Sequence, residues 1–207
     1  MAERIPPGRA GRLWLLDRLA AARGGANLLD RKRQLLRREY EQLVELAGER
    51  RRAWTDACAD AQRWGMRVAM AGGAAELVLD AGGVAGSARA TLIWTTTMGV
   101  RHPEDARCEL PQIDPAVVGA AVAAVGPAAA AYRRALEFGV AVAVAETARD
   151  HIERELRATQ QRLRGIQRKR IPALEGGLQA LELQLEELER EERVITRWAK
   201  QSREGNG

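Results

Sequence analysis

The sequence has few aromatic residues, because Phe, Trp and Tyr together make up 4% of its 207 residues. Large globular cores usually contain more of these side chains, so the low content argues against one big compact domain. Cys58 and Cys108 lie far apart without metal-type spacing, which argues against a disulfide framework and against secretion. We therefore expect an elongated protein of a reducing compartment.

The sequence also lacks the common motifs of nucleotide and metal chemistry. It contains no GxxxxGK[ST] loop and no GxGxxG after a strand, so we do not expect it to hydrolyse nucleotide by itself. The histidines His102 and His151 belong to no HExxH or Ser-His-acid arrangement. A metal site between His102 and Glu109 is conceivable, but a polar loop before Pro111 explains the same residues. We predict no catalytic residue, no cofactor and no metal.

Long hydrophobic runs are missing too. The uncharged run from Pro115 to Tyr132 is mostly Ala and Gly, contains Pro127 and is followed directly by Arg133, so it is too weakly apolar to span a bilayer. The first twelve residues carry charges but no apolar core, unlike a signal peptide. A cytoplasmic location is the expectation.

Two stripes of apolar residues at alternating steps of four and three are the main positive signal. Such a repeat over several heptads is typical of a coiled-coil seam. The first stripe is broken only by Arg50 and consists of Leu36, Tyr40, Leu43, Ala47, Trp54, Ala57, Ala61, Trp64 and Val68. The second is broken only by Glu192 and consists of Leu174, Leu178, Leu181, Leu185, Leu188 and Ile195. Since neither stripe can bury itself alone, we expect the first helix to fold antiparallel against the last, stripe against stripe.

The sequence between the stripes predicts a small head. In residues 91–98, β-branched residues at every second position alternate with mostly apolar residues, a period of two that favours a strand. A hairpin is plausible here, with Leu77 or Val78 as a candidate for its first strand. Residues 101–115 contain three prolines and several acids and are typical of a loop. From Ala116 an Ala-rich helix is expected, with a break near Gly126.

This pattern divides the chain into three parts within a mainly α fold. We predict a shaft helix over residues 9–71, a head over 72–127 with the hairpin and the Ala-rich helix, and a second shaft helix over 128–203. At 1.5 Å per residue the first helix would be roughly 90 Å long. Gly24 and Gly25 mark either a soft point or a close backbone approach. Pro172 predicts a bend just before Ala173, unless Gly176 and its neighbour mark a tight helix contact instead.

Charge adds a bias toward acidic partners. The net charge is +5, and residues 1–70 carry 15 basic and 9 acidic side chains. The clusters 31–38 and 50–52 would attract DNA, but no aromatic residues are interleaved with them and no base-reading motif is present. An acidic protein surface is the better partner, and solvated helix faces without a partner remain an alternative.

Three separated blocks of sequence resemble the D subunit of the V-type and archaeal-type rotary ATPases. Residues 16–43, LDRLAAARGGANLLDRKRQLLRREYEQL, are similar to the N-terminal signature of this family. Within this block, the signature positions are occupied by Leu28, Leu29, Lys32, Arg33 and Leu36.

The other two blocks follow in the family's order. Met98, Gly99 and Val100 within TTTMGVRHPE resemble the short strand and Met-Gly-Val segment of the family's head, and Ile93 of the predicted strand is a further candidate residue of the hairpin. The stretch LELQLEELEREERVITRWAK at residues 181–200 resembles the family's C-terminal helix. The residues before it that share this resemblance are Ile166, Arg170, Ile171, Pro172, Leu174 and Glu175.

The resemblance implies a central rotor shaft that is not itself an enzyme. It implies that the termini enter the catalytic hexamer of A and B subunits, that an F subunit clasps the shaft, and that the far end reaches a funnel-like socket subunit on the membrane ring. Candidate contacts to the hexamer are Arg12, Arg18, Arg23, Arg193 and Arg197. A stand-alone coiled-coil adaptor or chaperone is the alternative from another class, and a nucleic-acid-binding rod is a third.

Overall fold

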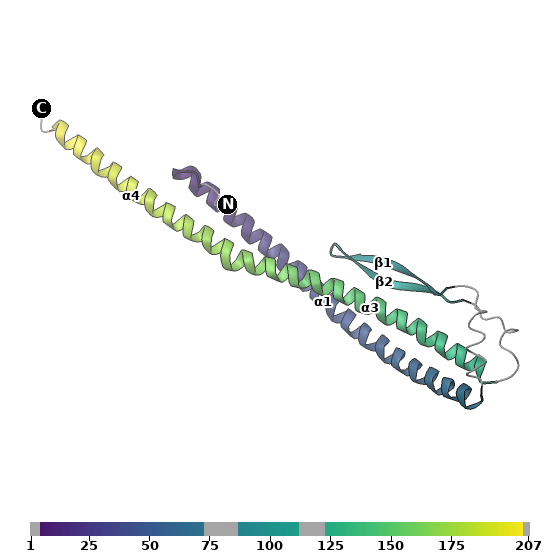
Figure 1. Ribbon diagram of the computed structural model, residues 1–207. Helices are drawn as coiled ribbons and strands as arrows, with labels where there is room; N and C mark the ends of the chain where they lie inside the picture. Colours follow the sequence, from purple (N-terminus) through teal and green to yellow (C-terminus); the bar gives the residue numbers. More distant parts are fainter. Residues whose placement is uncertain (1–4, 73–86, 112–122, 205–207) are drawn as a thin grey trace. The chain divides into compact units, whose positions relative to one another are not determined.

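The computed structural model describes residues 5–72, 87–111 and 123–204, with side chains up to residue 198. Helix α1 covers Gly8–Met70, and a continuous helical stretch is formed by α3 (Val125–Gly165), the π-helix η2 (Ile166–Arg170) and α4 (Ile171–Glu204). Between them, strands β1 (Arg89–Thr97) and β2 (Val100–Glu109) form an antiparallel hairpin (Figure 1). The prediction of a mainly α fold with long terminal helices and a central hairpin is confirmed. Leu77, Val78 and the predicted helix from Ala116 lie outside the described residues.

The chain divides into two compact units. The first, which we call the terminal unit, comprises Met1–Arg33 and Ala158–Gly207. The second, which we call the hairpin unit, comprises Gln34–Arg157. Helix α1 contributes to both, so its two parts have different helix partners.

In the hairpin unit, α1 packs against α3 along a heptad seam. Leu36 and Leu43 of α1 form one buried cluster with Ala148, Ile152 and Leu156 of α3. Leu36 and Ile152 are fully buried at 0% exposure. Burying a side chain of this size stabilises the fold by about 1.5–3 kcal/mol, so Leu36 and Ile152 contribute substantially to the pairing of α1 with α3.

Toward the end of α1 the seam is made of small residues. Ala57 and Ala61 pack against Ala131 and Ala135, and Val68 closes the far end of the seam against the start of α3. Side chains this small allow two helix backbones to approach closely, because little volume separates them. The low aromatic content of the sequence is therefore compatible with a well-packed core.

Large side chains are accommodated beside glycines at two points of this seam. A Cβ placed on Gly139 would lie 3.1 Å from Nε1 of Trp54, and one on Gly65 would lie 2.6 Å from the hydroxyl of Tyr132. A side chain at Gly139 would therefore press on the half-buried Trp54, whose ring would have to shift by a few tenths of an ångström.

In the terminal unit, α1 pairs with α4, and this corrects the expected matching of the two stripes. The stripe at 36–68 faces small and branched residues of α3, which sequence analysis had not marked as a seam. The stripe at 174–188 faces the start of α1, where Leu15 is 1% exposed and Leu19 is 6% exposed. In an antiparallel arrangement the start of α1 lies beside α4, the last helix of the chain. The later part of α1 therefore lies beside α3, which precedes α4 in the sequence.

The hairpin closes with a two-residue turn. Thr97 pairs with Val100, and Met98 and Gly99 between them have φ angles of 52° and 80°. Positive φ at both positions is the signature of a type I′ turn, whose twist matches that of the flanking strands. Glycine adopts this conformation freely, whereas Met98 is strained in it.

The expected loop over residues 101–115 was wrong for residues 101–109, which belong to β2, and residues 112–115 lie outside the described residues. Proline is unfavourable in a strand because it has no N–H to donate to the neighbouring strand. At position 103 this costs no hydrogen bond to β1. The carbonyl of Arg101 points away from β1 toward α3, and residues two apart in a strand point the same way, so the nitrogen of Pro103 also lies on the outer edge. Glu104 is left unpaired as a β-bulge, since Trp94 pairs with Pro103 and Ile93 with Asp105.

The irregularity expected at Pro172 is a π-helical turn. Residues 166–170 form η2, and the N–H of Ile171 donates to the carbonyl of Ile166. Proline cannot donate to the carbonyl four residues before it and clashes with that group, and a widened turn relieves the clash. The glycines are not tight contacts: a Cβ on Gly24, Gly25 or Gly176 would meet nothing within 4 Å, and one on Gly177 only ordinary contacts.

Candidate functional site

Ion pairs join the two helices of the terminal unit. Arg12 lies 2.8 Å from Glu182, Arg23 lies 2.7 Å from Glu175, and the more exposed Arg9 lies 3.5 Å from Glu189. Each involves side chains that are largely open to solvent, so each is worth only about 0–1 kcal/mol. Because the three pairs are spread along α1 and α4, together they favour one antiparallel register of the two helices.

The five predicted contact arginines therefore differ in what they do within the chain. Arg12 and Arg23 hold α1 against α4. Arg18 stacks over the Trp14 ring at 5.2 Å. Arg193 donates from Nε to the carbonyl of Glu189 on its own helix, at 3.0 Å. Arg197 lies one turn further along α4 and is exposed.

The predicted seam of α4 is less buried than that of α1. Leu174, Leu178, Leu181 and Leu185 are half-buried, and Leu188 is 54% exposed. The reason is length: α1 begins at Gly8, and its residue Arg9 is already level with Glu189. Beyond this point α4 has no α1 residues opposite it, and Val194, Ile195 and Trp198 are also exposed.

Within the predicted seam of α1, the structure buries Leu36 and Leu43 and half-buries Tyr40, Trp54 and Trp64. The break at Arg50 has a use, because its Nη1 donates to the carbonyl of Ala141 on α3 at 3.1 Å. The seam also continues toward the N-terminus through four buried residues that the sequence prediction omitted. Their steps of four and three were visible in the sequence: Leu15, Leu19, Ala22 and Ala26.

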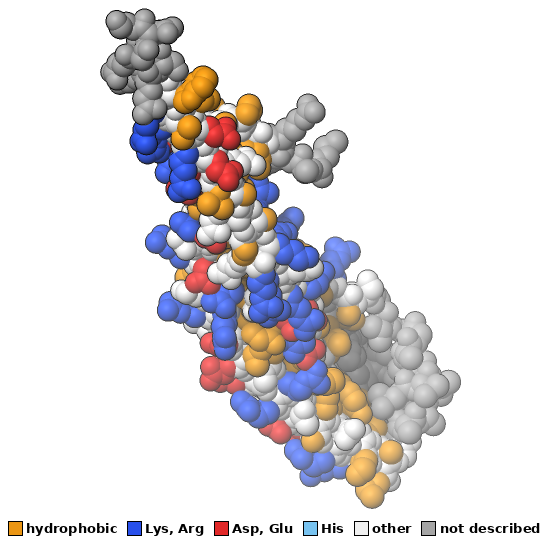
Figure 2. Space-filling view, turned by 90° about the vertical axis from the view of Figure 1, so that its left-hand side faces the viewer, with side chains coloured by type: hydrophobic (Ala, Val, Ile, Leu, Met, Phe, Trp, Pro, Cys, Tyr) orange, Lys and Arg blue, Asp and Glu red, His pale blue; other side chains and the backbone are white. Residues whose placement is uncertain are grey.

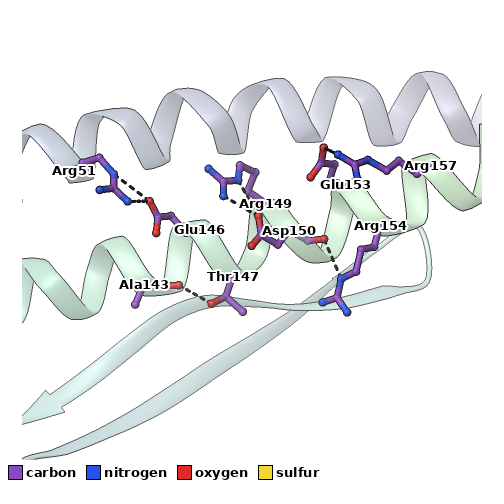
Figure 3. Close-up of polar contacts among 9 residues, drawn as sticks. All are labelled: Arg51, Ala143, Glu146, Thr147, Arg149, Asp150, Glu153, Arg154 and Arg157. Atoms are coloured by element: carbon purple, nitrogen blue, oxygen red, sulfur yellow. Dashed lines mark hydrogen bonds and ion pairs between the residues drawn. The ribbon is translucent and has the colours of Figure 1, made fainter.

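Polar contacts bridge α1 and α3 and also follow α3 itself (Figure 3). Arg51 of α1 donates from Nε to Glu146 of α3 at 3.1 Å. Arg149 donates from Nε and Nη2 to Asp150 at 3.0 and 2.8 Å. This hydrogen bonding raises the pKa of Arg149 above its ordinary value, with partial burial opposing it and the nearby carboxylates adding to it. The guanidinium is charged at every physiological pH, so its charge does not make this contact depend on pH.

The tip of the hairpin is held against α3. Nδ1 of His151 lies 3.0 Å from the carbonyl oxygen of Arg101, and because a carbonyl can only accept, Nδ1 carries the proton. The rings of His151 and Trp94 are 6.2 Å apart, and the guanidinium of Arg101 lies 4.9 Å above the Trp94 ring. Val100 packs against the buried cluster around Leu36. Both strands thus contribute to docking.

The four residues predicted for the hairpin occupy one strand, the turn and the next strand. Ile93 lies in β1, Met98 and Gly99 form the turn, and Val100 begins β2. Ile93 and Met98 are 46% and 47% exposed, so the hairpin presents apolar side chains to its surroundings.

The described part of the chain offers no obvious place for a metal or a redox pair. It contains no group of three His, Cys, Asp or Glu side chains placed to hold a metal ion. His102 is buried and bonds within the hairpin, with Nε2 3.1 Å from the Thr97 hydroxyl and Nδ1 3.2 Å from the Pro103 carbonyl. Cys58 and Cys108 are free thiols. Among residues the structure describes, moreover, no helix combines the length and the apolar character needed to cross a membrane.

On the face shown in Figure 2, Lys and Arg side chains gather in larger numbers than Asp and Glu. The described residues thus present helix pairs with exposed basic side chains and a docked hairpin with exposed apolar side chains.

Comparison with known proteins agrees with this description. Residues 13–201 match the family described as the D subunit of ATP synthase. The chain is 28% identical over 188 residues to the D subunit of the V-type ATP synthase of Thermotoga neapolitana, and the match covers 91% of this chain and 93% of that relative. With nearly the whole chain matched, it belongs to the family of ATP synthase D subunits and is one of the subunits of a V-type ATPase.

Proposed function

We propose that the chain is the central rotor shaft of a V-type or archaeal-type rotary ATPase. In this role it transmits torque between a catalytic hexamer of A and B subunits and the ion-translocating ring in the membrane. An F subunit and a funnel-like socket subunit would be its other partners. The family match from residue 13 to residue 201 is the observation that carries the proposal.

The helix pairs support a mechanical role. A shaft must pass torque without absorbing it as twist, and two helices locked by a buried seam resist twisting better than one. Helix α1 buries a seam in each unit, from Leu15 near its start to Val68 near its end, against the partner helix of that unit. Ion pairs such as Arg51–Glu146 and Arg23–Glu175 oppose sliding of one helix along the other.

The chain ends would meet the hexamer. Because α4 continues past the start of α1, its exposed face beyond Glu189 is free to contact the inner wall of a surrounding ring. Arg193 and Arg197 are the candidates for contact with acidic loops there, whereas Arg12 and Arg23 are already occupied in pairing the helices. Exposed ion pairs contribute about 0–1 kcal/mol each, and weak contacts suit a bearing that has to slide.

In this assignment the chain itself is non-catalytic. ATP would be hydrolysed or synthesised on the A and B subunits, and ions would pass through the membrane ring. The chain would be peripheral to the membrane, attached only through its partners.

Reconstitution tests this function. The full-length chain is mixed with the A, B and F subunits of its own source, and assembly is followed by size-exclusion chromatography together with ATP hydrolysis. The proposal predicts a stable complex with the unaltered chain. Leu43→Asp or Leu181→Asp should weaken assembly or disturb ATP hydrolysis, since each places a charge in the seam. Normal assembly and normal ATP hydrolysis after both changes would remove the seam from the mechanism. Failure of the unaltered chain to join the complex would overturn the function itself.

A further inference from the structure

Strand β1 is an exposed edge of the hairpin. Seven of its nine residues are exposed and the other two are half-buried. At its centre, the side chains of Leu92, Ile93 and Trp94 are 43%, 46% and 40% exposed. In the part of the chain that the structure describes, β1 pairs with β2 and with no other strand. A strand with one unoccupied edge is a template for a further strand.

The register with β2 determines which backbone groups of β1 point outward. Thr97 and Val100 flank the two-residue turn, and such a pair exchanges both of its backbone hydrogen bonds. Inward and outward residues alternate along a strand, so every second residue before Thr97 directs its N–H and C=O toward β2. The residues between them, whose backbone groups point away from β2, are Ala90, Leu92, Trp94 and Thr96.

β1 lacks the features with which proteins usually protect a free edge. Such edges carry proline, a bulge or several charged side chains, each of which hinders an added strand. β1 contains no proline and one charged residue, Arg89 at its start. β2 has all three features, namely Pro103, the bulge at Glu104 and five charged residues. Of the two strands, β1 is therefore the one open to pairing.

The outer edge of β1 lies on the side of the hairpin away from α3. The outer edge of β2 is the one that meets the helix, because the carbonyl of Arg101 accepts a hydrogen bond from His151. Figure 1 likewise draws β2 nearer to α3 than β1. If two hairpins were joined through β1, the helices of the two copies would therefore lie at opposite edges of the joined sheet.

The sequence of β1 is complementary to a second copy of itself. In an antiparallel pair centred on Ile93, this residue lies opposite its own copy, and Leu92 lies opposite Trp94 of the second copy. Apolar and aromatic residues that face each other across two strands stabilise the pair. Arg89, the single charged residue, lies opposite Thr97, so no like charges meet along the strand. In this register outward residues also pair with outward residues, as the hydrogen bonds require.

We propose that the chain pairs with a second copy of itself through β1, so that two hairpins form one four-stranded antiparallel sheet. A second copy fits because the match follows from β1 alone and has the two-fold symmetry of an interface between identical chains. A two-stranded hairpin is marginally stable, and additional strands stabilise it. Because the interface is small, the pairing is weak and reversible. The inference concerns the free chain and does not depend on the rotor function.

The test measures self-association of the full-length chain by sedimentation velocity, at concentrations from about 1 to 300 μM, a range suited to weak interfaces. Ile93→Lys places two like charges opposite each other at the centre of the pair, at a side chain that is nearly half exposed. Ile93→Glu does the same with negative charge. The matched control is Glu104→Gln, which also raises the net charge by one but lies at the bulge of β2. Circular dichroism checks that all variants keep the helix content.

The unaltered chain and Glu104→Gln should both form a dimer with a dissociation constant on the order of 10–100 μM. Each Ile93 variant alone should associate at least about tenfold more weakly, because like charges face each other. An equimolar mixture of Ile93→Lys and Ile93→Glu should recover the dimer, since opposite charges then meet, and this recovery also shows that both variants are folded.

A chain that is monomeric at every concentration, or a dimer that both Ile93 variants retain, would overturn the proposal. A mixture that stays monomeric would overturn the pairing of Ile93 with its own copy. If the unaltered chain is monomeric and Ile93→Lys weakens its binding to the A, B or F subunits, the edge of β1 serves one of those subunits instead of a second copy. None of these outcomes contradicts the rotor function, which is tested by assembly of the unaltered chain.

Discussion

His151 of α3 donates from Nδ1 to the main-chain carbonyl of Arg101 at 3.0 Å, and this bond ties the tip of the hairpin to the helix beneath it. The contact joins residues 50 positions apart and is reinforced by Trp94, whose ring faces His151. Substitution of His151 therefore tests how the hairpin is held against α3.

His151→Ala should loosen the hairpin. Loss of one hydrogen bond costs about 0.5–1.5 kcal/mol, so amide hydrogen exchange in β1 and β2 should speed up about threefold to tenfold. Exchange in α1 and α3 should be unchanged. Arg154→Gln is the control, since this residue of the same helix donates only to the carbonyl of Asp150. Equal exchange in the two variants would show that the hairpin is held by other contacts.

Leu36 and Leu35 are adjacent on α1 but differ in environment, with 0% and 43% exposure. Leu36→Ala should destabilise the protein by about 2–5 kcal/mol, because it leaves a cavity beside Ile152. Leu35→Ala changes the same chemistry at a half-exposed position and should cost less than about 1 kcal/mol. Urea unfolding followed by circular dichroism measures both, and similar values for the two would contradict the seam.

Two glycines of α1 should respond to alanine in opposite ways. A Cβ on Gly48 would meet nothing within 4 Å, so Gly48→Ala should stabilise the protein by about 0.5–1 kcal/mol through helix propensity. A Cβ on Gly11 would lie 2.0 Å from the carbonyl oxygen of Pro6, so the backbone must move and Gly11→Ala should destabilise. Midpoints of thermal unfolding give the two signs. Stabilisation by both substitutions would mean that residues before α1 are not packed against it.

Pro172→Ala should favour regular α-helix where η2 now stands. The new N–H can donate to the carbonyl of Arg168, and the clash that the π-turn relieves is gone. Because a helix-interior proline costs about 3 kcal/mol and η2 already recovers part of that, the free energy of unfolding should rise by about 1–2 kcal/mol. Hydrogen exchange at residues 166–172 should slow. If stability falls instead, the π-turn is held by contacts of its own.

Sequence reasoning located the long helices and the strand at residues 91–98, because both have strong local signals. The apolar residues from Leu36 to Val68 repeat with the heptad period, and residues 91–98 alternate with period two. The partner of that heptad was harder to find. Its seam on α3 consists largely of alanine, and an Ala-rich helix shows little contrast between a buried and an exposed face.

The second strand was missed for a physical reason as well. Pro103 is unfavourable inside a sheet unless its nitrogen faces outward, and the sequence does not state which way the residue faces. Only the pairing with Trp94 and the bond from His151 to Arg101 establish the direction. Likewise, the ion pairs of Arg12 and Arg23 depend on the register of two distant helices, so their role inside the chain was not visible in the sequence.

The most direct test of the rotor assignment is observation of rotation. The A and B subunits are fixed to a glass surface, and a bead is attached through a Glu104→Cys substitution at the exposed bulge of β2. The assignment predicts that ATP drives unidirectional rotation of the bead, and that the rotation stops when nucleotide is removed. Steady ATP hydrolysis by the same complexes with the bead stationary or moving at random would contradict it.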